Sequence, residues 1–144
     1  MKRPPKRRTG AIVITIITAG LIAGLSSCAR DDASLELTAA REGEIIVASD
    51  DGNGSMTAVI TGRLARVGPC IGLEDLLVIW PAGTTWDTTT STLTMPGGHT
   101  LTLGEQTELG GGAVPASSLS ASSDELAQAL TDCNAQPEQD VWLI

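Results

Sequence analysis

The chain contains no phenylalanine and no tyrosine, and its only aromatic residues are Trp80, Trp86 and Trp142. A hydrophobic core must therefore be built from Val, Ile, Leu and these three indoles. The chain has 144 residues, which is about one domain. The core is therefore small, and a small domain is marginally stable unless a covalent link supports it.

Basic residues are scarce after residue 27. That part of the chain holds all 17 acidic residues but only four of the nine basic ones, so its net charge is 4 − 17 = −13. Phosphate backbones are bound through Lys and Arg, so we expect no nucleic-acid partner. Anionic lipid headgroups are disfavoured for the same reason, and membrane attachment would need a covalent anchor.

Recognisable catalytic and metal-binding patterns are also lacking. His99 is the only histidine, and no second histidine or spaced cysteine completes a metal site around it. The residues from Asp51 to Ser55 begin like a calcium loop, but Met56 and Gly62 stand where that loop needs a glycine and an acidic residue. We therefore expect a turn there, no metal and no cofactor.

Nucleophilic and phosphate-binding motifs are missing as well. The serines between 117 and 123 lie in a low-complexity run predicted to be flexible, without a G-x-S-x-G elbow. Gly110-Gly111-Gly112 lacks the lysine of a phosphate loop, which predicts a hinge or turn. Adjacent carboxylates, as in Glu74-Asp75, point apart on a strand. The sequence predicts no catalytic residues and a protein that is not an enzyme.

The first 27 residues have the features of a signal peptide. Residues 1–10 carry five positive charges and no acid, and residues 11–25 form an uncharged, mostly apolar run. This run is shorter than the roughly 20 residues of a spanning helix, so a permanent transmembrane anchor is the weaker interpretation. Arg7-Arg8 leaves twin-arginine export open, although Thr9-Gly10 interrupts the expected apolar continuation.

Leu25-Ser26-Ser27-Cys28 resembles the lipobox of bacterial lipoproteins, in which an aliphatic residue and two small residues precede an obligatory cysteine. The resemblance implies that Cys28 receives a diacylglyceryl group, becomes the first mature residue and holds the protein on the extracytoplasmic face of the cell membrane. Two acyl chains anchor a protein far more firmly than one. The alternative is that Cys28 is an incidental thiol behind an ordinary secretory cleavage site.

Lipidation of Cys28 would also account for the odd number of cysteines. An exported protein with three cysteines has one left over, and modification of Cys28 leaves Cys70 and Cys133 to form a disulfide. Leu126, Ala129, Leu130 and Cys133 fall at helical spacing on one face, which turns Cys133 inward. Ser122 and Glu125 predict the capping box at the start of this helix.

After Cys28 the pattern predicts a flexible tether over 28–43 and a disulfide-stapled β domain over 44–144. Residues 44–48 and 56–67 flank a turn-rich stretch and predict a β-hairpin. Residues 76–81 predict a buried strand, and 92–95 with 99–103 predict a hairpin around Pro96-Gly97-Gly98. Residues 106–109 and 141–144 predict two further strands.

Many short strands and one C-terminal helix predict a mainly β fold, a small closed or partly closed OB-like β-barrel, with a β-sandwich as the alternative. From Gly62 to Ile144, the order of cysteines, the Trp80-Pro81 strand end and the glycine-rich turns is similar to small lipoprotein and secreted domains of high-GC bacteria. That resemblance implies export and fold, and brings no activity with it.

Trp80 and Trp86 allow two interpretations, because each could belong to the core or could contact a ligand or partner. The leading hypothesis is a membrane-anchored, non-enzymatic binding or envelope-associated module, whose partner is an envelope protein or a small ligand. The alternative is a divalent-metal or small-ligand binding protein that uses acidic turns. An enzyme with scattered carboxylates is a third hypothesis.

Overall fold

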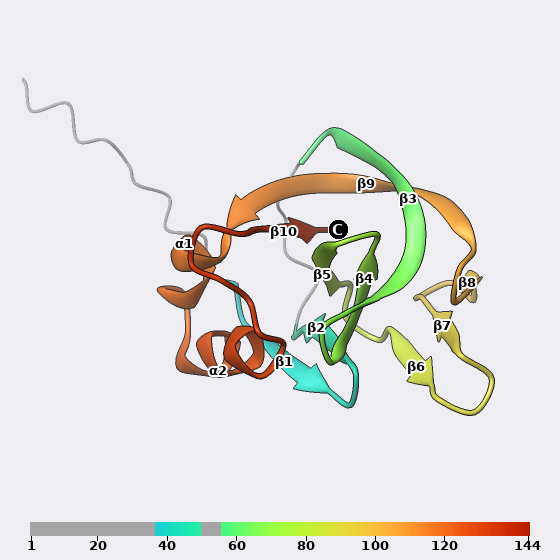
Figure 1. The fold of residues 1–144 in the computed structure, drawn as a ribbon, viewed down its shortest axis with the longest axis horizontal. Helices are drawn as coiled ribbons and strands as arrows, with labels where there is room; N and C mark the ends of the chain where they lie inside the picture. Colours follow the sequence, from blue (N-terminus) through green and yellow to red (C-terminus); the bar gives the residue numbers. More distant parts are fainter. Residues whose placement is uncertain (1–36, 50–55) are drawn as a thin grey trace, which may run out of the picture. The chain divides into compact units, whose positions relative to one another are not determined.

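The computed structural model of the protein describes residues 37–49 and 56–144, which belong to one compact unit, Ala33–Ile144 (Figure 1). The described residues form ten strands and two helices. In chain order these are β1 Ala39–Glu42, β2 Ile45–Ala48, β3 Ala58–Val67, β4 Cys70–Leu73, β5 Leu76–Trp80, β6 Thr85–Asp87, β7 Thr92–Thr94, β8 Thr100–Thr102, β9 Gln106–Pro115, α1 Ala116–Ser120, α2 Asp124–Asp132 and β10 Asp140–Leu143.

Five of the strands close into a barrel. Their order is β5–β10–β9–β3–β4, and β4 pairs with β5 to complete the ring. All of these pairings are antiparallel except that of β5 with β10, which is parallel. The fold is thus mainly β with a small closed barrel, OB-like in outline, as the sequence predicted.

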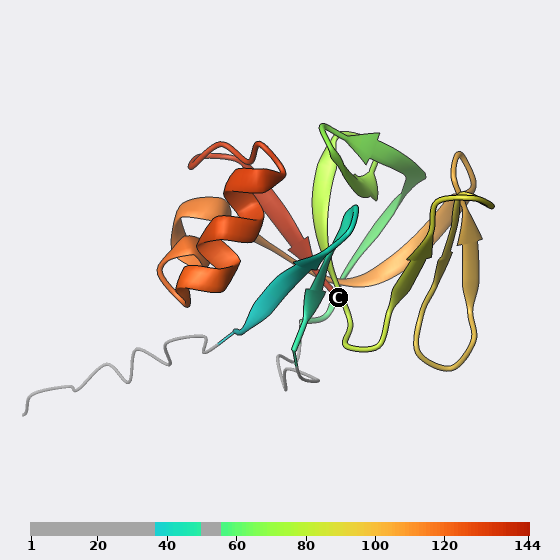
Figure 2. The same cartoon turned by 90° about the horizontal axis from the view of Figure 1, so that it is seen from below.

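The β1–β2 hairpin extends the sheet beside β5 (Figure 2). β2 runs antiparallel to β1 and parallel to β5, with Ile46 opposite Ile79. The predicted hairpin between 44–48 and 56–67 is therefore wrong, because β2 and β3 do not pair with each other. The turn-forming residues between them predict a change of direction, but they do not specify the partner strand. The turn itself lies outside the described residues.

The compact domain also begins earlier than predicted. The sequence predicts that residues 37–43 belong to the tether, but Leu37 and Ala39 are buried in the core and β1 begins at Ala39. Pairing with β2 satisfies the backbone polar groups of this segment, which a polar composition alone did not indicate. The tether prediction can hold only for residues 28–36, which lie outside the described residues.

A second, three-stranded sheet is formed by β6, β7 and β8. The predicted hairpin around Pro96-Gly97-Gly98 joins β7 and β8, and the Met95 N–H donates to the His99 carbonyl at 2.8 Å. Because side chains alternate along a strand, Leu93 and Leu101 point into the core while the neighbouring threonines are more exposed.

The glycine triplet lies inside β9, which corrects the predicted hinge or turn. β9 changes partner within it, since Gly111 is opposite Ala58 of β3 and Gly112 is opposite Leu143 of β10. A Cβ on Gly111 would overlap the Leu143 carbonyl oxygen and approach the Trp142 Nε1 at 2.7 Å. The glycines therefore permit close backbone packing at a barrel corner.

The C-terminal helical region contains two helices where one was predicted. α1 lies in the serine run and is held by the buried side chains of Ala116 and Leu119. α2 begins one residue later than predicted, because Ser123 and not Ser122 is its N-cap and accepts from the Leu126 N–H at 3.2 Å. Neither helix has the length or apolar character needed to span a membrane.

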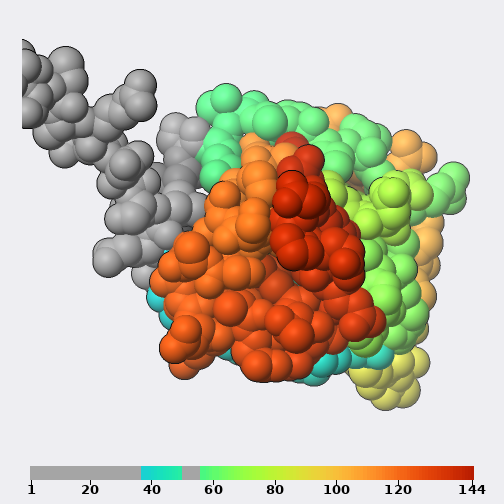
Figure 3. Space-filling view, turned by 60° about the vertical axis from the view of Figure 1, so that its left-hand side comes forward, coloured from blue at the N-terminus to red at the C-terminus, as the bar shows by residue number. Residues whose placement is uncertain are grey.

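The core is divided by the barrel wall into two clusters. Leu77 and Ile79 of β5 pack toward α1 and α2, whereas Val78 and Trp80 belong to the second cluster, with Leu64 of β3. The predicted strand at 76–81 is thus buried on both faces, which explains its continuous apolar run. Figure 3 shows the segment from α1 to β10 covering one side of the domain.

Candidate functional site

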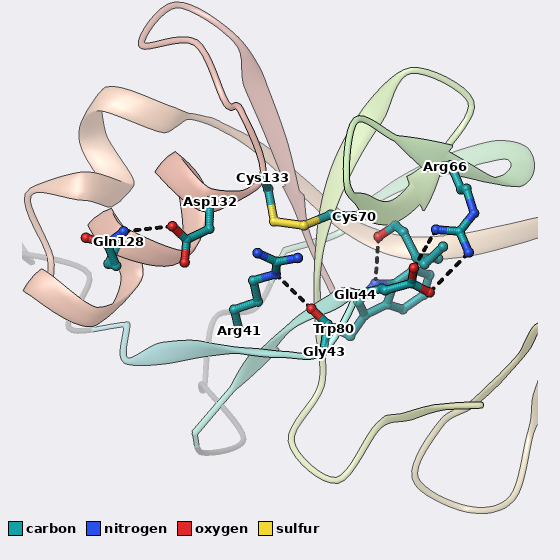
Figure 4. The surroundings of a disulfide bond; sticks show 10 residues. Arg41, Gly43, Glu44, Arg66, Cys70, Trp80, Gln128, Asp132 and Cys133 are labelled. Atoms are coloured by element: carbon teal, nitrogen blue, oxygen red, sulfur yellow. Dashed lines mark hydrogen bonds and ion pairs between the residues drawn. A yellow bond between two sulfur atoms is a disulfide. The ribbon is translucent and has the colours of Figure 1, made fainter. Parts of the chain in front are cut away.

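The structure pairs Cys70 and Cys133, as predicted (Figure 4). Cys70 is the first residue of β4, and Cys133 caps the C-terminal end of α2, where its Cα is 5.4 Å from that of Cys70. Both cysteines are buried. The disulfide fastens the helical layer to the barrel wall. Cys28, the predicted lipidation site, lies outside the described residues.

Trp80 lies in the core and has no exposed surface. Its indole Nε1 donates to the Ile71 carbonyl at 3.2 Å, so the polar atom of the ring is satisfied inside the protein. Burial with a satisfied N–H favours the core interpretation of Trp80 over a role in contacting a ligand.

Trp86 is partly exposed to solvent, whereas Trp80 and Trp142 are buried. It lies on β6 and packs against the second core cluster. Its Nε1 donates to the Glu44 Oε2 at 2.5 Å. The ring is therefore fixed in orientation while part of it faces solvent.

Glu44 joins three parts of the domain. It lies in the β1–β2 turn and receives a bidentate pair of hydrogen bonds from Arg66 of β3, Nη1 to Oε1 at 2.6 Å and Nη2 to Oε2 at 3.2 Å (Figure 4). With the bond from Trp86 of β6, three donors converge on one carboxylate. We call Glu44, Arg66 and Trp86 the Glu44 cluster.

The hydrogen bond from Arg66 lowers the pKa of the Glu44 carboxyl below its ordinary value. Partial desolvation raises this pKa and so opposes the change. The hydrogen bond from Trp86 and the positive charges of Arg66 and Arg41 lower it further. The pKa of Arg66 is raised by the same carboxylate. Glu44 therefore stays ionised and holds its donors in place.

The Glu44 cluster combines an ionised, fully engaged carboxylate with an exposed guanidinium and an accessible indole. The carboxylate already accepts three hydrogen bonds, which leaves it little capacity to act as a base. The Arg66 side chain is 46% exposed, and an accessible indole lies beside it. Indole and guanidinium groups are enriched where proteins bind partners, because both bury a large area while offering directional polar contacts.

His99 and Glu74, two polar residues considered from the sequence, share no hydrogen bond with the Glu44 cluster among the described residues. His99 is exposed at the β7–β8 hairpin. Glu74 accepts from the Arg63 N–H of β3, and Glu105 accepts from the Thr102 N–H of β8. Asp87 accepts from the Thr89 and Thr90 N–H groups that follow it in the chain. The hydrogen bonds that the backbone N–H groups of Thr89 and Thr90 donate to Asp87 lower the pKa of its carboxyl. Within the described segments, no three His, Cys, Asp or Glu side chains are grouped so that they could hold a metal ion.

No motif in the sequence marks Glu44 or Arg66 as a site residue. Glu44 is 22 residues from Arg66 and 42 from Trp86, so no local spacing connects them. The one available signal was the scarcity of basic residues, which makes each arginine after residue 27 a candidate for a specific role.

Comparison of the chain with protein-family models, with curated proteins and with solved structures finds no match.

Proposed function

We propose that this protein is a lipid-anchored, extracytoplasmic binding module without catalytic activity, attached to the cell membrane through Cys28. The lipobox resemblance of residues 25–28 supports the anchor and its location. A small barrel fastened by a disulfide supports an exported protein, because disulfides persist in oxidising compartments.

The observation that carries the binding role is the Glu44 cluster. Its accessible indole is held in one orientation beside an exposed guanidinium, so a partner would meet a preorganised surface and pay little conformational entropy. Elsewhere the domain is acidic, since residues 67–144 contain ten carboxylates and no Lys or Arg. We propose an envelope protein as the partner, with this cluster at the centre of the contact.

In-cell crosslinking tests this proposal. A photo-reactive amino acid at Thr85, the exposed neighbour of Trp86, should capture one envelope protein reproducibly, and Trp86→Leu should reduce that yield. The same group at Thr131, exposed on α2, is the control position. Equal capture from both positions, or capture that does not depend on Trp86, would contradict the assignment of the site.

The anchor has its own test. Intact-mass analysis of the membrane fraction should show a chain that begins at a diacylated Cys28, and Cys28→Ser should release the domain from that fraction. An unmodified Cys28 in membrane-bound protein, or cleavage at another residue, would refute lipid anchoring.

A small ligand is the second candidate for the same surface. The exposed part of an indole beside a guanidinium suits a flat or sugar-like ring that stacks on the one and accepts hydrogen bonds from the other. Saturable quenching of tryptophan emission that is lost in Trp86→Leu would favour it.

A further inference from the structure

The two ends of the β1–β2 hairpin differ in charge. The turn end carries Glu44 with Arg41 close enough to influence it, and Arg66 reaches it from β3. The open end consists of Leu37–Ala39 and Ala48–Ser49, where the Ser49 N–H donates to the Thr38 carbonyl at 2.7 Å. This open end carries no charged side chain among its described residues and is where the chain enters the domain (Figure 2).

One row of residues leads from this open end across the sheet. Ala40 is opposite Val47, and Val47 is opposite Trp80. Leu143 of β10 is opposite Ile79 of β5 and Gly112 of β9. The next residue, Ile144, therefore lies level with Trp80 on one side and Gly111 on the other. Gly111 is in turn opposite Ala58 at the start of β3. The ends of β1, β2, β5, β10 and β3 therefore lie along one line.

The exposed apolar side chains of the domain lie along this line. Val59 is 60% exposed and Ile144 is 40% exposed, and these are the exposed large hydrophobic residues of the described segments. Residues 56–60 and 110–113 around them contain no acidic or basic side chain. We call this surface the neutral end. It consists of the open end of the β1–β2 hairpin together with Ala58, Val59, Gly110–Ala113 and Ile144.

The length of chain between the anchor and the domain limits how far this end can lie from the membrane. Eight residues, 29–36, separate Cys28 from Leu37, which is buried in the core. Nine Cα-to-Cα steps span at most about 30 Å even when fully extended. The chain therefore enters the domain at Leu37, in the neutral end, within about 30 Å of the point where the lipid would be attached.

We infer that the neutral end rests on the surface of the bilayer that holds the lipid anchor, an inference that depends on the proposed lipidation of Cys28. Apolar side chains gain free energy at the boundary between headgroups and acyl chains. No acidic side chain belongs to the neutral end as defined, so anionic headgroups oppose this contact less than they would oppose contact through the ten carboxylates of residues 67–144. The turn end with the Glu44 cluster then points away from the membrane, where a partner can reach it.

Depth-dependent fluorescence quenching tests the orientation. The full lipidated protein is placed in vesicles of phosphatidylcholine and phosphatidylglycerol, with an environment-sensitive dye on a single added cysteine, Val59→Cys, Ile144→Cys or Glu42→Cys. Glu42 is exposed at the turn end of the same hairpin and serves as the matched control. Nitroxide lipids should remove roughly half of the emission from positions 59 and 144 and little from position 42, because interfacial insertion is shallow.

If the protein stays on the vesicles, either of two results would overturn the inference. One is equal quenching of the dye at all three positions, and the other is stronger quenching at position 42 than at positions 59 and 144. Loss of the protein from the vesicles, with an unmodified Cys28 by mass, would instead refute the proposed function. As a second variant, Val59→Asp should abolish the quenching at position 144, whereas Thr131→Asp on α2 should preserve it. Thermal melting of each variant distinguishes altered orientation from unfolding.

Discussion

Gly111 of β9 has no room for a side chain. Its φ of 152° lies in a region that side-chain-bearing residues rarely adopt, and a Cβ would overlap the Leu143 carbonyl oxygen. Gly110, the preceding residue, faces open space where a methyl group would meet no neighbouring atom. The two adjacent glycines therefore have different roles within one strand.

We expect Gly111→Ala to lower the free energy of unfolding by roughly 3 kcal/mol or more, through backbone strain and overpacking. Gly110→Ala, its matched control, should change it by less than about 1 kcal/mol. Chemical denaturation of both variants measures the difference. Similar losses in the two variants would show that the close approach of β9 and β10 does not determine the requirement for glycine.

Glu44 provides a second prediction at the scale of one residue, with a defined pH dependence. Its pKa is lower in the folded protein than in the unfolded chain, so the stabilisation is present above the ordinary glutamate pKa. It is lost as the pH falls through the lowered value. Glu44→Gln keeps the size of the side chain but removes the charge that attracts Arg66 and Trp86.

The melting temperature of Glu44→Gln should therefore lie below that of the unaltered protein at neutral pH, and the difference should disappear in acid. Glu42→Gln, at an exposed carboxylate two residues away, should have little effect at either pH. If the difference in melting temperature between Glu44→Gln and the unaltered protein stays constant or widens in acid, the assigned role of the carboxylate is wrong.

At the scale of elements, α2 depends on its first turn. The Ser123 side chain accepts from the Leu126 N–H, and Asp124 and Glu125 complement the positive end of the helix. Leu126, Ala129 and Leu130 are buried on its inner face. The cap thus sets the start of the helix that presents Cys133 to the barrel.

Ser123→Ala should cost about 1 kcal/mol of stability, because it removes the side chain that satisfies the Leu126 N–H. Ser122→Ala should cost less than about half as much, since Ser122 lies outside the helix. Equilibrium unfolding in urea measures both. A larger loss for Ser122→Ala would restore the cap position that the sequence pattern predicted.

At the scale of the whole molecule, the disulfide connects elements that are 63 residues apart in sequence. Closing a loop of this length is worth about 4 kcal/mol in the chain-entropy model, a large share of the 5–15 kcal/mol that stabilises a typical domain. It also joins the helical layer, which packs on one face of the barrel wall, to β4.

We expect the double variant Cys70→Ser/Cys133→Ser to lose about 4 kcal/mol of stability and to melt on the order of 15 °C or more below the unaltered protein. A reductant strong enough to open the disulfide should lower the melting temperature of the unaltered protein toward that of the variant. It should leave the variant itself unchanged. Equal melting temperatures for both proteins would show that the helical layer is held by packing alone.

Sequence patterns alone specified the features that depend on neighbouring residues. Periodicity and turn chemistry predicted the buried strand at 76–81, which the structure has as β5, and the hairpin around Pro96-Gly97-Gly98. They also predicted the inward face of α2 and a small closed or partly closed β-barrel, which is closed in the structure. The pairing of Cys70 with Cys133 followed from their number once Cys28 was set apart. The lipobox resemblance, which the described residues do not include, stays a prediction.

Tertiary structure decided what depends on contacts between distant segments. Only the fold pairs β2 with β1 and β5, places the glycine triplet inside β9, and brings Arg66 and Trp86 to the carboxylate of Glu44. Local spacing carries no information about which segment will lie beside a given strand, because backbone pairing is the same for any sequence. Burial of the two core clusters selects among the possible pairings, and that selection requires the whole chain.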